Sequence, residues 1–172
     1  MKTLELFVRL TDAVNEFLGK AVSWFVPLLM LVTVYDVLMR YIFRATSVKF
    51  MDIETNLYIL NFMLAAGWTL IHDGHVRVDL VYARLDQKKK AWINIFGSLV
   101  FCVPFCILVI WTSWPYVLDS WRVLEGSPDP GGLPGTFLIK TSIPVTFFLL
   151  GMQAVSQAIK NLFTVMGKEV KA

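Results

Sequence analysis

Long runs of apolar residues, separated by short clusters of charge, dominate this 172-residue chain. Almost no charged residue occurs in four stretches, residues 21–39, 55–71, 91–118 and 141–159. A transmembrane α-helix needs about 20 mostly apolar residues, and three of the stretches reach that length directly. The second reaches it when Glu54 lies at the membrane interface. The pattern predicts an all-α integral membrane protein with four transmembrane helices, at about residues 21–43, 53–73, 88–118 and 137–160.

Two further helices are predicted outside these spans. Apolar residues at helical spacing make residues 3–20 an amphipathic helix, along the membrane surface or as a cytoplasmic extension of the first span. Gly74 can take the left-handed conformation that ends a helix. After it, apolar residues recur at helical spacing as far as Leu85, which predicts a short interfacial helix. The three lysines at residues 88–90 follow, and cations placed there bind the headgroups of anionic phospholipids.

The composition agrees with a membrane protein. Hydrophobic residues make up 56% of the chain and charged residues only 17%, against about 25% charged in soluble domains. A soluble helical bundle is the alternative, but residues 91–118 and 141–159 have no polar face wide enough to meet water. We therefore expect a single membrane domain over residues 1–172. The first span is too long for a cleaved signal peptide and lacks a small-residue cleavage site.

The distribution of Lys and Arg predicts the orientation of the chain. Eleven of these residues fall in the N-terminal segment, the connection between the second and third spans, and the C-terminal tail, whereas five fall on the other side. Because cytoplasmic connections carry the excess of positive charge, both termini should be cytoplasmic. The basic run at residues 88–90 lies beside membrane spans, so we expect no nucleic-acid partner for it.

Polar and small residues within the spans are candidates for contacts between helices. Asp36 and Arg40 have the i, i+4 spacing of neighbours on a helix, and a local ion pair explains both charges better than transport chemistry does. Small residues let helices approach closely in membranes. They occur at Ala65-Ala66-Gly67 in the second span and at Gly151, Ala154 and Ala158 in the fourth. The sequence leaves open whether they contact this chain or another subunit.

The sequence contains no recognisable set of catalytic residues. Its only histidines, His72 and His75, lie in one turn, where a complete metal shell is hard to build and a haem cannot be bound from both faces. Cys102 and Cys106 lie in the middle of a span and are best explained as small packing residues. Transporters often have internal repeats and a binding site near the membrane midplane. The spans of this chain show no internal repeat and few polar groups at their centres. We therefore expect a non-catalytic subunit without a cofactor, rather than an independent transporter.

Several blocks, in order along the chain, carry a family resemblance. They are Arg40-Tyr41-x-Phe43, Asp52-x-Glu54, Ala65-Ala66-Gly67-x-Thr69-Leu70, Asp73-Gly74-His75-Val76-Arg77-Val78-Asp79, Ser120-Trp121, Glu125-x-Ser127-x-Asp129-Pro130-Gly131-Gly132-Leu133-Pro134 and Lys140-x-x-Ile143-Pro144. Together they resemble the small membrane subunit of TRAP transporters, the tripartite ATP-independent periplasmic family, and within it the mannitol/chloroaromatic branch. Two positions depart from the family pattern: Thr55, where relatives often have Trp, and His72, where a basic residue is common.

The resemblance implies a four-helix scaffold subunit in the bacterial inner membrane. Its partners would be a large TRAP permease, which carries the substrate and sodium sites, and a periplasmic substrate-binding protein that delivers an organic acid. Candidate subunit-interface or structural residues are Asp36, Arg40, Asp52, Glu54, Ala66, Gly67, Gly74, His75, Arg77, Asp79, Gly151, Ala154 and Ala158. Candidates for docking the binding protein are Asp129, Pro130, Gly131 and Gly132. Four spans with two histidines leave a membrane-anchor subunit of a redox enzyme as the alternative.

Overall fold

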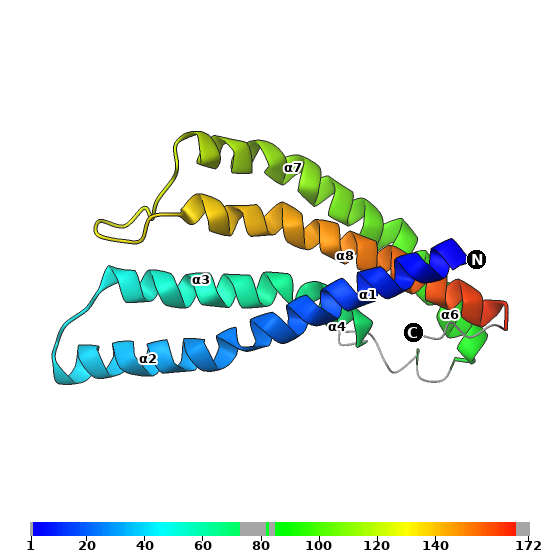
Figure 1. Ribbon diagram of the computed structural model, residues 1–172, viewed down its shortest axis with the longest axis horizontal. Coiled ribbons are helices and arrows are strands. Elements are labelled where there is room, and N and C mark those ends of the chain that lie inside the picture. The colour runs from blue at the N-terminus through cyan, green and yellow to red at the C-terminus, as the bar shows by residue number, and fades with distance from the viewer. Residues whose placement is uncertain (1, 73–81, 83–84, 168–172) are drawn as a thin grey trace.

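The computed structural model describes residues 2–72, 82 and 85–167, and every regular element within those ranges is a helix (Figure 1). Three helical stretches there are long and apolar enough to cross a membrane: residues 2–42, 87–122 and 136–165. They correspond to the first, third and fourth predicted spans. The predicted all-α membrane class is therefore confirmed, whereas the expected number of four spans is not.

The first of these stretches consists of α1 (Lys2–Ser23) and α2 (Phe25–Ile42), which follow one another with a step at Trp24. The step lies beside Pro27. Proline has no backbone N–H, so the carbonyl of Ser23 receives no helical hydrogen bond from residue 27. The predicted amphipathic helix and first span thus form a nearly continuous rod (Figure 1).

The second predicted span is split in two. It forms α3 (Val48–Leu64) and α4 (Ala66–Ile71), separated at Ala65, and neither piece alone reaches about 20 residues, the length of a typical span. The Thr69 hydroxyl donates a hydrogen bond of 3.0 Å to the Ala65 carbonyl, a bond that often bends helices.

The third stretch is interrupted but not ended. It comprises α6 (Gln87–Phe96), a π-helical segment η1 (Gly97–Cys102) and α7 (Val103–Arg122). Pro104 cannot donate to the carbonyl four residues earlier, which is the kind of defect that a π-bulge accommodates. The helix passes through Pro115 to Arg122, beyond the predicted end at residue 118.

The last helix, α8 (Thr136–Val165), is the centre of the fold. It packs against α1, α3, α4, α6, α7 and η1, whereas α2 packs against α3 and α1. Buried side chains accordingly concentrate in α1 and α8, and α2 buries only Asp36. The hairpins α2–α3 and α7–α8 lie side by side near α1 and diverge toward their connecting loops (Figure 1).

We name the two ends of the molecule by this arrangement. The crossing end is where α1 passes over α4 and the C-terminal half of α8, at residues 8–22, 66–72 and 153–163. The loop end holds the α2–α3 connection, residues 43–47, and the α7–α8 connection, residues 123–135.

Candidate functional sites at the two ends of the bundle

At the crossing end, α1 and α4 interlock through two glycines. A Cβ atom added to Gly19 would lie well within 3.0 Å of the Trp68 side chain, and one added to Gly67 would lie equally close to the Asn15 side chain. Both glycines are buried. Each helix therefore places a large side chain over a glycine of the other, which brings the backbones close together.

Asn15 also joins α1 to α8. Its Nδ2 donates to the Gln153 Oε1 at 2.9 Å and to the Thr11 carbonyl at 3.1 Å. Asn15 and Gln153 are 1% and 0% exposed, so water does not compete for these bonds. In such a dry setting these hydrogen bonds fix the register of the two helices, because sliding would break them and leave further buried polar groups without partners, as the Asn15 Oδ1 already is among the described residues.

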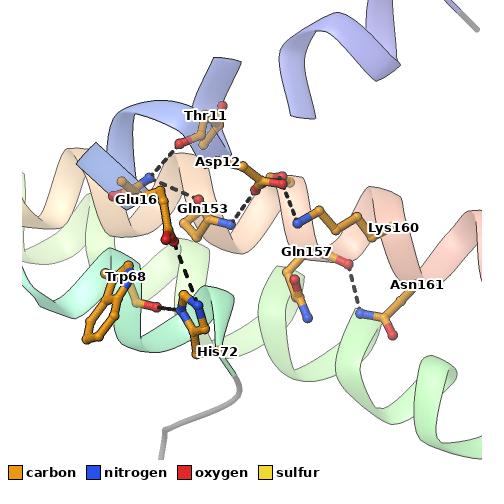
Figure 2. A network of polar contacts seen from close by, with 11 residues as sticks. Thr11, Asp12, Glu16, Trp68, His72, Gln153, Gln157, Lys160 and Asn161 are labelled. Carbon is orange, nitrogen blue, oxygen red and sulfur yellow. Dashed lines mark hydrogen bonds and ion pairs between the residues drawn. The ribbon is translucent and has the colours of Figure 1, made fainter. Parts of the chain in front are cut away.

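Asp12 is the centre of this network (Figure 2). Its carboxylate accepts hydrogen bonds from Gln153 Nε2 at 2.9 Å and from Ser156 Oγ at 3.2 Å. The ammonium of Lys160 lies 2.5 Å from the second carboxylate oxygen. A carboxylate with three donors, one of them a balancing cation, is well compensated for its partial burial, and all three partners come from α8. We call these residues, with Asn15, the crossing network.

His72 lies at the edge of this region without a metal shell. Its Nε2 lies 3.7 Å from a Glu16 carboxylate oxygen, and its Nδ1 lies 3.1 Å from the Trp68 carbonyl (Figure 2). Among the described residues, no three His, Cys, Asp or Glu side chains gather as metal ligands. His75 lies outside those residues, as do Gly74, Arg77, Asp79 and most of the predicted interfacial helix.

Asp36 and Arg40 form the ion pair that their spacing predicts. Arg40 Nη2 donates to Asp36 Oδ2 at 2.5 Å, and the Asp36 side chain is 4% exposed while that of Arg40 is 48% exposed. The pair shields the only buried residue of α2. A contact of this pair with another subunit stays a prediction.

At the loop end, Asp52 ties α3 to the α7–α8 connection. Its Oδ2 accepts a hydrogen bond of 2.7 Å from the backbone N–H of Leu133, 81 residues away. The carbonyl of Leu133 accepts from the Ser127 N–H at 2.9 Å, and the Asp129 carbonyl accepts from the Gly132 N–H at 3.0 Å. We call residues 125–135 the clasp.

Gly132 makes this contact possible. A Cβ atom there would lie within 3.0 Å of both Ser127 and the Asp52 carboxylate. Gly131 has φ 83°, a left-handed conformation that favours glycine. Asp129, Pro130 and Gly131 are exposed. These contacts give the clasp a defined shape, while its docking role stays a prediction.

The start of the clasp is held by Glu125. Its carboxylate lies 2.5 Å from the Lys140 ammonium and accepts a bond of 2.6 Å from Ser120 Oγ. The Lys140 ammonium, followed by the Ser120 hydroxyl, lowers the pKa of the Glu125 carboxyl below its ordinary value. The sequence offered Glu125 and Lys140 only as parts of resembling blocks. Their pairing joins the clasp to α8.

A cleft separates α3 from α8 beneath the clasp. Its volume is about 500 Å³, and its lining comes from α3, α8, the clasp and Tyr116 of α7. We call it the loop-end cleft. Sequence reasoning did not find it, because its lining comes from four segments far apart in the chain.

The remaining candidates fall in several places. Ala154 and Ala158 are buried in α8, and a Cβ at Gly151 would make ordinary contact with Cys106 at 3.4 Å. Ala66 begins α4. Glu54 has a buried carboxylate oxygen without a partner among the described residues. Gln153 and Ser156, on the same helix as Ala154 and Ala158, face α1 of this chain.

Sequence reasoning gave no special role to Asp12, Asn15, Gly19 or Lys160. Asp12 and Asn15 were visible as the polar positions of the N-terminal amphipathic helix. A polar face usually faces water, so nothing local marked it as a face that packs against a membrane helix. Gly19 within a helix was the one available signal, since glycine weakens helices unless close packing requires it.

One comparison with known proteins identifies a family. A family model described as tripartite ATP-independent periplasmic transporters, DctQ component, matches residues 29–164, which is well over half of the chain. The match includes α3, α4, α7, the clasp and nearly all of α8, and it begins after α1. A search of the curated proteins found no match.

Proposed function

The chain belongs to the DctQ family of TRAP transporter components, and from this premise we propose that it is the scaffold on which a large permease is held. It is a membrane subunit of a transporter and not an enzyme. Membership of this family therefore rejects the alternative, a membrane-anchor subunit of a redox enzyme. The proposal adds the role within the complex: this subunit enlarges and steadies the static part while the permease performs sodium-coupled uptake of an organic acid.

The observation that carries the proposal is the interlocked crossing end. A scaffold must keep its shape while its partner moves, and the glycine contacts and the crossing network resist sliding of α1, α4 and α8. Large apolar side chains along α2 and α7 are left exposed, among them Met30, Leu31, Ile107, Leu108 and Trp111. Faces of this kind contact lipid or another membrane subunit.

The proposal includes an orientation. The excess of Lys and Arg at the crossing end and in the connections beside it supports a cytoplasmic location for both termini in the bacterial inner membrane. The clasp then faces the periplasm, where the exposed Asp129, Pro130 and Gly131, beside the partly buried Gly132, form a shaped surface for a substrate-binding protein. Sodium ions and substrate bind to the permease in this proposal, with no cofactor in this subunit.

Co-purification and uptake test the scaffold role together. An affinity-tagged chain should retain the large permease through purification, and proteoliposomes should take up organic acid with sodium only when both subunits and the binding protein are present. A chain with residues 126–135 replaced by a Gly/Ser linker should keep the permease and lose contact with the binding protein. A stable lone subunit, together with uptake that persists in its absence, would reject the scaffold role.

A further inference from the structure

The loop-end cleft has the dimensions of a ligand site. Its volume of about 500 Å³ lies within the range of about 300–1,000 Å³ typical of small-molecule pockets. Along α3 its wall extends from Asp52 to Met63. At 1.5 Å per residue these 11 steps cover about 16 Å, which is close to half of the ~30 Å hydrocarbon core of a bilayer. The cleft is therefore about as deep as one leaflet.

The inner part of the cleft is apolar. Ile59 and Met63 face it from α3, and Ile139 and Ile143 face it from α8. Each pair is spaced by four residues, so each forms a stripe along its helix. A cleft between two membrane helices with such stripes suits a hydrocarbon chain.

The rim of the cleft is charged. Asp52 and Asp129 provide two carboxylates, and Lys140 provides one ammonium. That ammonium is already paired with Glu125 and lies 4.1 Å from the centre of the Tyr116 ring. The rim thus offers carboxylate acceptors to an incoming cation, with one cation beside them.

We propose that the loop-end cleft binds one phospholipid with a primary-ammonium headgroup, as in phosphatidylethanolamine. The lipid ammonium donates hydrogen bonds to Asp52 and Asp129, its phosphate faces Lys140, and one acyl chain lies between the two apolar stripes. An ammonium with three N–H donors matches carboxylate acceptors, whereas a quaternary ammonium has no N–H to donate and an anionic headgroup would be repelled by both carboxylates.

The charges of the rim and the depth of the cleft favour a lipid over a segment of a protein partner. The rim complements a zwitterion with its two charges side by side, and the apolar depth matches one leaflet. The proposal rests on the membrane location and the cleft, and it does not depend on the scaffold role.

Native mass spectrometry of the full chain, purified with its permease, tests the proposal. The complex is stripped with detergent and supplied with phosphatidylethanolamine, phosphatidylcholine or phosphatidylglycerol of identical acyl chains. Asp52→Asn keeps an acceptor for Leu133 but removes the charge, and it should lower retention of phosphatidylethanolamine at least fivefold. The matched control is Asp119→Asn, which alters an exposed carboxylate paired with Arg122 and should leave retention unchanged.

A second variant fills the cleft without changing its charge. Ile59→Trp should remove one bound phosphatidylethanolamine per complex while the permease still co-purifies. Equal retention of the three lipids by the unaltered complex would overturn the proposal, as would retention that neither variant reduces. Cross-linking of a permease segment into the cleft would overturn it too, by showing a protein occupant.

Discussion

The crossing end and the loop end hold the same helices together by different means. At the crossing end, side chains of α1 and α4 cover glycines of the opposite helix, and buried amides and a carboxylate join α1 to α8. At the loop end, a cleft separates α3 from α8, and one carboxylate–amide hydrogen bond spans it from Asp52 to Leu133. Helix pairs in one small bundle can thus be locked at one end and separated at the other.

The difference has a physical cause. In lipid, apolar side chains gain little by leaving one apolar environment for another, so helices associate through close packing and hydrogen bonds. Small residues and amides occur together at the crossing end, whereas Ile59, Met63 and Ile143 line the loop-end cleft. Substitutions at the two ends should therefore differ in their effect on stability.

The largest effect is expected for Gly19→Ala. The new methyl group would clash with the fixed part of the Trp68 side chain, so α1 would have to move away from α4. Overpacking of this kind costs about 1–3 kcal/mol, and each kcal/mol lowers the Tm of a chain this size by about 2–4 °C. Thermal unfolding in detergent measures the shift.

Gly97→Ala is the matched control, since a Cβ there meets no heavy atom within 4 Å. Its Tm should equal or slightly exceed that of the unaltered chain. Equal losses in the two variants would show that α1 and α4 are not interlocked.

A somewhat smaller effect is expected for Asp12→Ala. It leaves the donors of Gln153, Ser156 and Lys160 without their shared acceptor. The Ser156 hydroxyl can turn to a carbonyl of its own helix, so the buried Gln153 amide is the donor left unsatisfied, which costs about 1–3 kcal/mol. Lys160 can turn toward water because its side chain is 25% exposed, which limits the total. Thermal unfolding and protease resistance of residues 2–23 measure the loss.

Asp119→Ala serves as the comparison for Asp12→Ala. It removes a carboxylate from an ion pair whose two side chains are both more than two-thirds exposed, and such pairs contribute about 0–1 kcal/mol. If the two substitutions change stability equally, the crossing network adds nothing beyond an ordinary surface contact.

The smallest effect is expected for Gly132→Ala at the loop end. The methyl group would displace Ser127 or the Asp52 carboxylate and break the bond to Leu133, which is worth about 0.5–1.5 kcal/mol. The clasp can shift, so unfolding should change little while limited proteolysis cuts residues 125–135 faster. Gly126→Ala, whose Cβ makes only ordinary contacts at 3.6 Å and 3.7 Å, should not change cleavage. A loss of Tm as large as that of Gly19→Ala would contradict the contrast between the ends.

Part of the fold could be read from local patterns. Three spans followed from apolar length, and the Asp36–Arg40 pair followed from its spacing. Each depends on residues close together in the chain. The break at Ala65 was missed, because one hydroxyl of Thr69 and packing against α1 and α8 outweigh a continuous apolar pattern.

The candidate sites were predicted less completely. Gly67 was recognised as a small packing residue, but its partner Asn15 was not, and Asp52 was recognised without Leu133. In each case the sequence marked one member of a contact, because small or charged residues stand out within apolar segments. The partner was an ordinary polar residue or a backbone amide with no local signature.

The sequence by itself determined that this protein is a helical membrane subunit, since apolar length and the order of short motifs are properties of the chain alone. Only the tertiary structure decided that Asp12 meets Lys160, that Gly19 lies beneath Trp68, and that α3 and α8 leave a cleft. Those contacts depend on which helix faces meet. In a membrane, where apolar faces gain little from one another, close packing and a few buried hydrogen bonds make that choice.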